Sequence, residues 1–184
     1  MNTLEAIEAR KSIRSYTDKT VEESIIDKVV TAGTQAASAV KLRLTVITKK
    51  DVLQIISTEA TYIFRSSGNK ALKEKASAFD FNALYNAPVL IVVSAEKTVT
   101  GRPSPLAFPS AGCAAQNMML AATDYELGSC FIQGIIPAFA NPNVSKAACI
   151  DPNDTPICAV LIGYTNDHES RGARPLAASV RYVK

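Results

Sequence analysis

Residues 110–126 read Ser-Ala-Gly-Cys-Ala-Ala-Gln-Asn-Met-Met-Leu-Ala-Ala-Thr-Asp-Tyr-Glu and form the most informative segment of the chain. When this segment is drawn as a helix, apolar side chains fall on nearly every side rather than along one stripe. The pattern predicts a central, buried helix, and its small alanine side chains allow another backbone to approach closely. We expect Gly128 to stop the helix, since glycine is favoured just after a helix end.

Continuous apolar runs lie on both sides of this helix in the sequence. Residues 88–94 and 157–163 each hold such a run, which is typical of a strand covered on both faces. Another strand is predicted to begin with Leu44 and Val46. The capping boxes Asn2-x-x-Glu5 and Thr20-x-x-Glu23 predict the start of two helices. Further elements are expected in this order: helices at 3–9, 21–33, 52–59 and 70–81, and a loop at 98–109.

The order of these elements and the composition limit the class of protein. Helices alternate irregularly with few strands, so we predict one α+β domain over residues 1–184, with 171–184 as a C-terminal arm. With 20 basic and 17 acidic residues, the net charge of +3 is too mild for nucleic-acid binding. No apolar run approaches the roughly 20 residues of a membrane-spanning helix. Glu5, Glu8 and Arg10 interrupt any signal-peptide core, so we expect a cytoplasmic protein with no membrane partner.

The cysteines and the single histidine argue against metal and acid–base chemistry. Cys113, Cys130, Cys149 and Cys158 form no C-x-x-C pair and lie among apolar residues, so we expect buried, reduced thiols. His168 lies in a polar turn and is interpreted as a solvated loop residue, which leaves no nucleophile–histidine triad. We therefore predict no metal site and no catalytic side chain.

Two basic motifs and one glycine-flanked segment are candidates for ligand binding. Arg10-Lys11-Ser12-Ile13-Arg14 combines two guanidinium groups with a hydroxyl, which suits phosphate oxygens; a solvated basic turn is the alternative. Arg171 and Arg174 follow the predicted last strand and could complete the same phosphate site. The segment 128–134 has a glycine at each end, so its backbone N–H groups can reach a flat ligand. An ordinary helix end leading into an edge strand is the alternative for that segment.

Taken together and in this order, these segments resemble the nitroreductase family of FMN-dependent oxidoreductases. The family opening, a short helix followed by Arg-x-Ser-x-Arg and an aromatic residue, is similar to residues 6–16. The second helix with its small-residue turn is similar to 29–39, and the central strand to 86–93. The core helix, the turn after it, the last strand and the tail resemble the remaining segments, 115–122, 127–130, 160–164 and 174–176.

The resemblance implies an α+β fold with a central, mostly antiparallel sheet flanked by helices, assembled as an intertwined homodimer. Two FMN molecules would bind at the subunit interface, and the helix at 111–122 would form the dimer core. FMN would receive a hydride at N5 from NADH or NADPH in a ping-pong reaction and pass the electrons to a nitroaromatic, a quinone or a similar small-molecule acceptor. A non-catalytic flavin-binding dimer, or specialised reductive chemistry such as dehalogenation, is the alternative.

The same resemblance implies which residues bind the cofactor. The basic and hydroxyl residues near the N-terminus would lie at the FMN phosphate and ribityl chain, and an arginine near the C-terminus would complete the phosphate site. Backbone N–H groups of Gln133 and Gly134 would face flavin N5 and O4, whereas Ser38 would come from the other subunit. The full set is Arg10, Lys11, Ser12, Arg14, Ser38, Ile132, Gln133, Gly134, Arg171 and Arg174.

The chain departs from the family pattern at residues 36–44. A proline, a pair of amide side chains and a tryptophan of the family are missing there. In the family these amides help to hold the flavin from the partner subunit. Lys41 or Arg43 is a candidate to replace them through its charge. Otherwise FMN affinity or substrate choice is altered in this protein.

Overall fold

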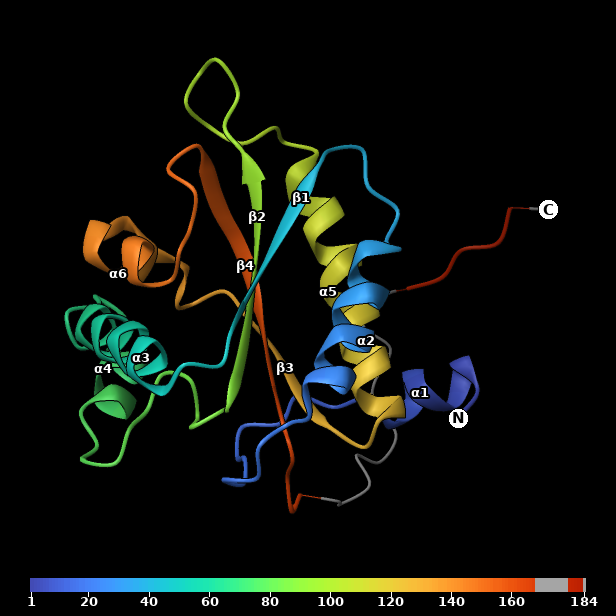
Figure 1. The fold of residues 1–184 in the computed structure, drawn as a ribbon, viewed down its shortest axis with the longest axis horizontal. Coiled ribbons are helices and arrows are strands. Elements are labelled where there is room, and N and C mark those ends of the chain that lie inside the picture. The colour runs from blue at the N-terminus through green and yellow to red at the C-terminus, as the bar shows by residue number, and fades with distance from the viewer. Residues whose placement is uncertain (168–178, 184) are drawn as a thin grey trace.

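A four-stranded sheet forms the middle layer of the computed structural model, which describes residues 1–167 and 179–183 (Figure 1). Every pair of neighbouring strands is antiparallel. The α+β fold with an antiparallel central sheet is therefore confirmed. Across the sheet the strands lie in the order β1 (Leu42–Ile47), β2 (Val89–Glu96), β4 (Asp154–Gly163) and β3 (Gly128–Ile132).

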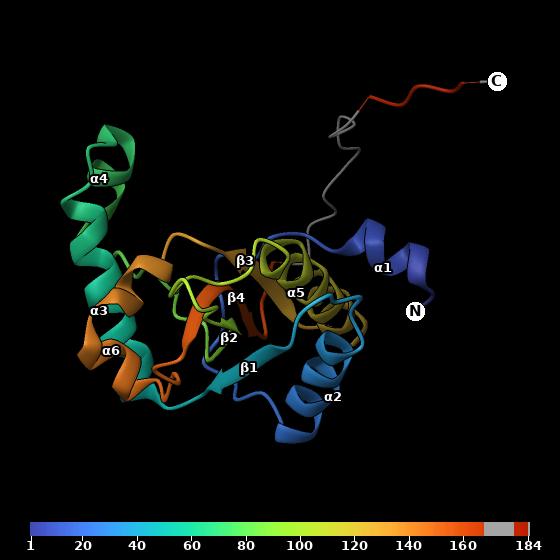
Figure 2. The same ribbon diagram turned by 90° about the horizontal axis from the view of Figure 1, so that it is seen from above.

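Both faces of the sheet are covered, because the central strands carry apolar side chains on both sides. Leu90 and Val92 belong to one core cluster, and Val89 and Ile91 belong to the other. Alternate residues of a strand point to opposite faces, so two-sided burial explains the unbroken apolar runs. Figure 2 shows the two helical groups on opposite sides of the sheet. One group holds α3 (Lys50–Arg65), α4 (Lys70–Ala76), η1 (Ile136–Ala140) and α6 (Pro142–Ala147), and the other holds α1 (Thr3–Ala9), α2 (Glu23–Thr34) and α5 (Ala107–Asp124).

The alanine-rich helix α5 is buried along one face and open along the other. Its buried side is lined by small side chains and two methionines, and it packs against α2 and the sheet. Phe108, Gly112, Cys113 and Gln116 are exposed along the opposite side. The prediction that α5 is buried nearly all round is therefore wrong for a single chain, because α2 and the sheet cover only part of its surface.

The ends of α5 also differ from the prediction. The helix begins at Ala107, inside the predicted loop, and its last residue is followed by Tyr125 as C-cap. Glu126 takes a left-handed conformation with φ of 58°, and the N–H of Leu127 donates to the carbonyl of Ala122 over 2.8 Å. The helix is thus stopped before Gly128, which is already the first residue of β3.

The other helices follow the sequence pattern with shifted ends. The Asn2–Glu5 capping box is present at α1, as predicted. The prediction of a capping box at Thr20 and Glu23 is wrong. Helix α2 starts at Glu23, and Glu22 occupies the N-cap position without a side-chain hydrogen bond. Helix α3 runs beyond residue 59 because its later residues still pack into the core. Helix α4 ends at Ala76, well before residue 81, with the hydroxyl of Ser77 bonded to a carbonyl of its last turn.

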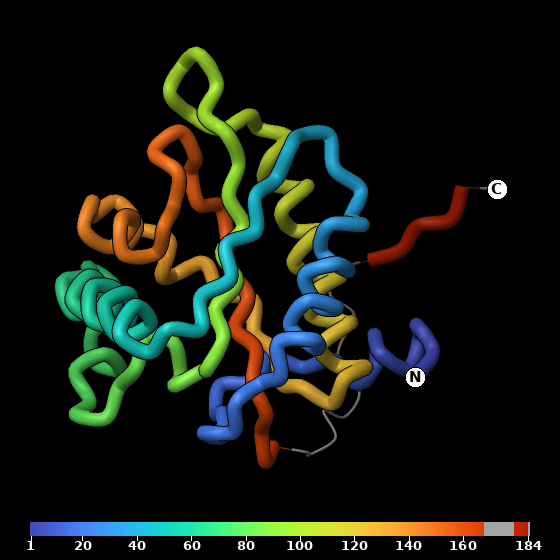
Figure 3. Tube along the Cα trace, in the orientation of Figure 1, coloured from blue at the N-terminus to red at the C-terminus, as the bar shows by residue number. Residues whose placement is uncertain are grey.

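Residues 97–106 form the predicted loop and project beyond one end of the sheet (Figure 3). A bridge between Lys97 and Pro103 closes it, and the N–H of Thr98 donates to the carbonyl of Arg102 over 2.7 Å. At its tip Val99 is fully exposed.

The cysteines are only partly as predicted. All four are free thiols, but Cys113 and Cys149 are exposed while Cys130 and Cys158 are buried. Apolar sequence neighbours did not ensure burial, because Cys113 lies on the open side of α5 and Cys149 follows the end of α6. Within residues 1–167 and 179–183, no group of three metal-ligating side chains is close enough to hold an ion. In the same part of the chain, no helix has the length and apolar character to cross a membrane.

Candidate functional site

An N-terminal segment, residues 10–16, lies against the first residues of β3. The N–H of Ile13 donates to the carbonyl of Ser129 over 2.9 Å, and Ser12 pairs with Ser129 in an isolated parallel bridge. Ile13 is buried, and a Cβ on Gly128 would lie only 2.9 Å from its Cγ2 atom. The segment therefore reaches the strand because residue 128 has no side chain.

The two arginines of this segment lie near the thiol of Cys130. Burial raises the pKa of Cys130, and the positive charges of Arg14 and Arg10 oppose that rise. Lys11 instead forms an ion pair with Asp167 and lines a separate cavity of about 1100 Å³ bordered by α1 and the end of α5. The structure thus brings the two arginines together at β3 and does not bring Lys11 to them. The predicted role of Lys11 stays a prediction.

The outer edge of β3 presents backbone groups beyond this segment. β3 is the last strand of the sheet, and residues 12 and 13 pair with its beginning at Ser129. In an antiparallel strand every second residue directs its main-chain groups to the same edge, so Phe131 directs its N–H outward as Ser129 does, and Gln133 follows the last residue of the strand. Gln133 is exposed, and its carbonyl accepts from the N–H of Ile136 over 3.0 Å, which fixes the turn into η1.

Ile132 and Gly134 serve this edge in different ways. The main chain of Ile132 pairs with Ala159 of β4 and its side chain lies in the core, so it supports the edge from behind. Gly134 is exposed, and a Cβ there would lie 3.1 Å from Cζ of Phe64 on α3. The edge therefore presents a short row of outward backbone groups, with the segment 10–14 paired at its beginning and the ring of Phe64 packed against the turn at its end. Such a row suits a flat, electron-rich ligand that carries an anionic group.

Ser38 lies far from this edge in the same chain. It is in the loop between α2 and β1, at the end of the sheet opposite the segment 10–16 (Figure 1). Its hydroxyl donates to the carbonyl of Val40 over 2.5 Å, and the N–H of Ala39 donates to Oγ of Ser110 on α5 over 3.2 Å. Ser38 is therefore placed beside the first turn of α5, and a single chain does not bring it to the arginines.

Arg43 is already engaged by carboxylates of the sheet. Its guanidinium pairs with Asp154, which is buried, and lies 3.9 Å from Asp151. The hydrogen bond to Asp154 and its charge raise the pKa of Arg43 further. Lys41 is exposed at the start of β1. Of the two candidates to replace the missing family amides, Arg43 is thus held in a structural ion pair.

Comparison with known families agrees with this arrangement. The model of the nitroreductase family matches residues 7–164. The chain belongs to the nitroreductase family. The resemblance drawn from the ordered motifs is confirmed, and the matched region contains the N-terminal arginines, β3 and the turn at Gly134. Arg171 and Arg174, together with His168, lie outside the described residues, so their predicted places stay predictions.

Relatives and solved structures match nearly the whole of this chain. A protein of Methanothermobacter thermautotrophicus, whose name includes NADH dehydrogenase and NAD(P)H nitroreductase, is 28% identical over 179 residues, which is 96% of this chain and 83% of that protein. A nitroreductase with bound FMN from Desulfitobacterium hafniense has a TM-score of 0.87 at 23% identity. One from Bacteroides fragilis, also with bound FMN, has a TM-score of 0.84 at 24% identity. Both superpositions cover 100% of each chain, which shows a common fold.

The motifs of this nitroreductase did not reveal one strained turn beside the site. Tyr85 and Asn86 both take left-handed backbone conformations, with φ of 54° and 60°. The N–H of Ala87 donates to the carbonyl of Leu84 over 3.0 Å and closes the turn. Asparagine tolerates this conformation, so Asn86 is a weak sequence signal, whereas nothing in the sequence indicates it for a tyrosine.

Proposed function

We propose that this nitroreductase binds FMN along the outer edge of β3 and uses it to transfer a hydride from NADH or NADPH to a small-molecule acceptor. The observation that supports this proposal is the segment carrying Arg10 and Arg14, since its Ser12 pairs with Ser129 at this edge and both positive charges act on the thiol of Cys130. With a quinone as acceptor, NAD(P)H and one proton would yield NAD(P)⁺ and the hydroquinone. With a nitroaromatic, the same two electrons would yield the nitroso compound and water.

The residues present at the edge fit the cofactor. Arg10 and Arg14 supply fixed positive charge, and charge-assisted hydrogen bonds to phosphate are among the strongest that proteins make. The glycine at position 134 lets the ring of Phe64 pack close to the main chain of the turn, since a Cβ there would lie 3.1 Å from Cζ of Phe64.

When bound, FMN supplies hydride transfer at N5, so no acid–base pair of the protein is needed for that step. The chain's own residues bind and orient it. The N–H groups of Gln133 and the neighbouring Gly134 would face one edge of the ring, and the arginines would hold the phosphate. Their positive charge also favours a cofactor that has gained electrons. The buried side chains of Cys130 and Ile132 keep water away from the inner side of the strand.

The open side of α5 supports a homodimer. Leu106 and Phe108 are more than half exposed there, and Leu4 and Ile7 of the neighbouring α1 are exposed as well. An apolar surface of this kind is typical of an interface between copies. A second copy on α5 would also bring its Ser38 loop, which is tied to α5 through Ser110, toward the cofactor site. The dimer and the cross-subunit role of Ser38 are therefore part of the proposal.

Replacing Arg10 tests the site directly. Arg10→Ala should weaken FMN binding by about 10- to 100-fold, because a hydrogen bond to a charged group contributes about 1.5–3 kcal/mol. The dissociation constant is measured by quenching of flavin fluorescence on protein stripped of cofactor. Lys146→Ala, which removes an exposed positive charge from α6, is the matched control and should bind FMN like wild type. Equal FMN affinity for wild type and Arg10→Ala would rule out the site.

A non-catalytic flavin-binding dimer is the second candidate. It is favoured by one observation: Arg43 is held by Asp154 and does not replace the amides missing from residues 36–44. Oxidation of NADH or NADPH by FMN-loaded protein separates the two functions. Steady-state oxidation that requires an added acceptor supports the oxidoreductase, whereas bound FMN that neither nucleotide reduces supports the non-catalytic dimer.

A further inference from the structure

Arg14 lies in a short loop whose two ends are fixed. The end before it is held at β3, where the N–H of Ile13 donates to the carbonyl of Ser129 over 2.9 Å. The end after it is held just beyond β4, where the N–H of Thr17 donates to the carbonyl of Tyr164 over 2.9 Å. Arg14 itself is exposed and lines a cavity of about 330 Å³. Packing therefore does not fix its side chain, and its place depends on the shape of the loop.

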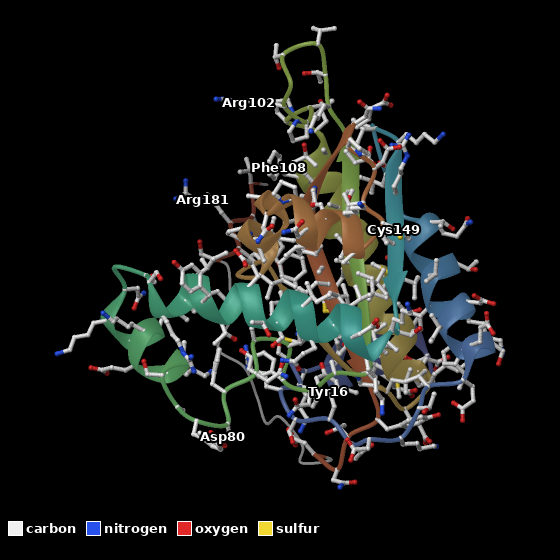
Figure 4. The ribbon with its side chains drawn as sticks, turned by 60° about the vertical axis from the view of Figure 1, so that its left-hand side comes forward. Tyr16, Asp80, Arg102, Phe108, Cys149 and Arg181 are labelled. Carbon is white, nitrogen blue, oxygen red and sulfur yellow. The ribbon has the colours of Figure 1, made fainter. Side chains whose placement is uncertain are left out.

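Tyr16 closes this loop with its side chain. Its hydroxyl donates to the carbonyl of Ile13 over 3.0 Å, so the bond spans Arg14. The ring is partly buried and packs against the core cluster on the α3 side of the sheet. It also lies against the end of β4, since a Cβ at Gly163 would be only 2.9 Å from Cδ1 of Tyr16. Figure 4 shows Tyr16 at the end of the sheet opposite Phe108.

The hydroxyl of Tyr16 is a reliable donor. Burial raises the pKa of Tyr16 above its ordinary value, so the phenol stays protonated at neutral and mildly alkaline pH. A buried Tyr O–H usually finds a hydrogen-bond partner, and here that partner is the main chain of the loop itself. Because the ring is wedged against Gly163 and the donor points to Ile13, the distance across the loop is set.

The two arginines of the segment are held in different ways. Arg10 is the C-cap of α1, and the main chain of that helix holds it. Since Arg10 precedes Ile13, the Tyr16 bond does not span it. Arg14 lies inside the closed loop, and its positive charge acts on both the Tyr16 phenol and the Cys130 thiol of β3. Tyr16 therefore governs the place of one arginine and not of the other.

We propose that Tyr16 is a positioning residue for the cofactor: its hydroxyl closes the loop across Arg14 and so holds that guanidinium at β3, where the proposed FMN site lies. The inference rests on the proposed function and adds a residue that acts on the cofactor through Arg14. A structural role is the alternative, in which the hydroxyl stabilises the whole segment and Arg10 depends on it as much as Arg14. The two roles differ in which arginine is coupled to Tyr16, and this coupling can be measured.

Tyr16→Phe tests the role, because it removes the donor and keeps the ring against Gly163. The dissociation constant of FMN is measured by quenching of flavin fluorescence on stripped protein. It should rise about 2- to 10-fold, as expected for the loss of one hydrogen bond between neutral groups. The same factor should appear when Tyr16→Phe is added to Arg10→Ala. It should nearly vanish when Tyr16→Phe is added to Arg14→Ala, since Tyr16 acts through Arg14 alone.

A matched control and a second readout make the test specific. Tyr164→Phe also removes a hydrogen-bonded phenol hydroxyl at this end of the sheet, one that donates to Glu22 over 2.6 Å. It should leave FMN affinity unchanged. The midpoint potential of the bound flavin should become more negative in Tyr16→Phe, because the reduced flavin carries more negative charge and depends more on Arg14. The same potential should not change in Tyr164→Phe.

Four results would overturn this role of Tyr16. Wild-type FMN affinity in Tyr16→Phe shows that the hydroxyl does not matter. An equal loss in the Arg10→Ala and Arg14→Ala backgrounds, or unfolding of Tyr16→Phe seen by circular dichroism, assigns the hydroxyl to structure. An equal loss in Tyr164→Phe shows a general effect at this end of the sheet. Failure of the proposed function is seen separately, because wild-type protein would then bind no FMN before any substitution is made.

Discussion

Gly128→Ala is the substitution that best tests how the site is assembled. The added methyl group would lie 2.9 Å from Cγ2 of Ile13 and 3.0 Å from its Cβ and Cγ1 atoms. These distances are shorter than real Cβ contacts, and Ile13 is buried, so it cannot swing into solvent. The segment 10–16 must therefore move away from β3, carrying Arg10 and Arg14 with it.

The cost of this change follows from the contacts that are lost. Overpacking a closely packed position costs about 1–3 kcal/mol. Lengthening the bond between the N–H of Ile13 and the carbonyl of Ser129 adds about 0.5–1.5 kcal/mol. We expect the free energy of unfolding of the cofactor-free protein to fall by about 2–4 kcal/mol. FMN affinity should fall by more than about tenfold, since both arginines shift relative to the strand.

Two measurements and two further variants make the test specific. Urea unfolding gives the stability of the stripped protein, and flavin fluorescence gives the dissociation constant of FMN. Gly68→Ala is the control, because a Cβ at Gly68 meets no atom within 4 Å. Combining Gly128→Ala with Ile13→Ala removes two of the three clashing atoms, so the two losses of stability should be less than additive. Wild-type FMN affinity in Gly128→Ala would refute the proposed assembly of the site.

Further predictions concern the sheet, a buried thiol and the dimer. Asp154→Asn removes the carboxylate that pairs with Arg43 and should lower the free energy of unfolding by about 1–3 kcal/mol. FMN affinity should be unchanged because Arg43 has a structural role, and weaker FMN binding would show that Arg43 contributes to the cofactor site. Burial raises the pKa of Cys158 from 9.0 to about 12. The neutral thiol therefore contributes fully to the stability of the folded protein below pH 9, and this contribution is lost as the pH rises from 9 to about 12. At pH 10 ionisation of Cys158 in the unfolded chain should lower the free energy of unfolding by about 1.4 kcal/mol. Cys158→Ala should abolish this part of the loss in urea unfolding, and a pH profile identical to that of wild type would exclude Cys158 as its source. Gly112→Arg, on the open side of α5, should convert the dimer to monomer in size-exclusion chromatography with light scattering, whereas an unchanged mass would place the interface elsewhere.

The sequence predicted those features that depend on neighbours along the chain. The runs at 88–94 and 157–163 became the two central strands, since only a strand buried on both faces needs apolar residues at every position. The first capping box was confirmed because its two hydrogen bonds join residues three apart. The second failed because α2 begins at Glu23 with Glu22 as its N-cap, two residues beyond the Thr20 that the motif predicts.

Other features depended on contacts that the sequence does not display. The open side of α5 follows from how much of the helix α2 and the sheet can cover, and residue type alone suggested burial on all sides. Lys11 and Arg14 were treated as one motif, yet they line different cavities, because alternate side chains of an extended segment point in opposite directions.

By itself, the sequence determined the fold class and the family, because these follow from hydrophobic pattern and from motifs that are local in the chain. Tertiary structure alone decided why residue 128 must be glycine: the side chain that would clash with its Cβ belongs to Ile13, distant in sequence. The tertiary structure also pairs Arg43 with Asp154 and places Tyr85 in the wall of a cavity that Arg14 and Lys75 line. Each of these is a contact between segments far apart in the chain, and such contacts exist only once the sheet has brought the segments together.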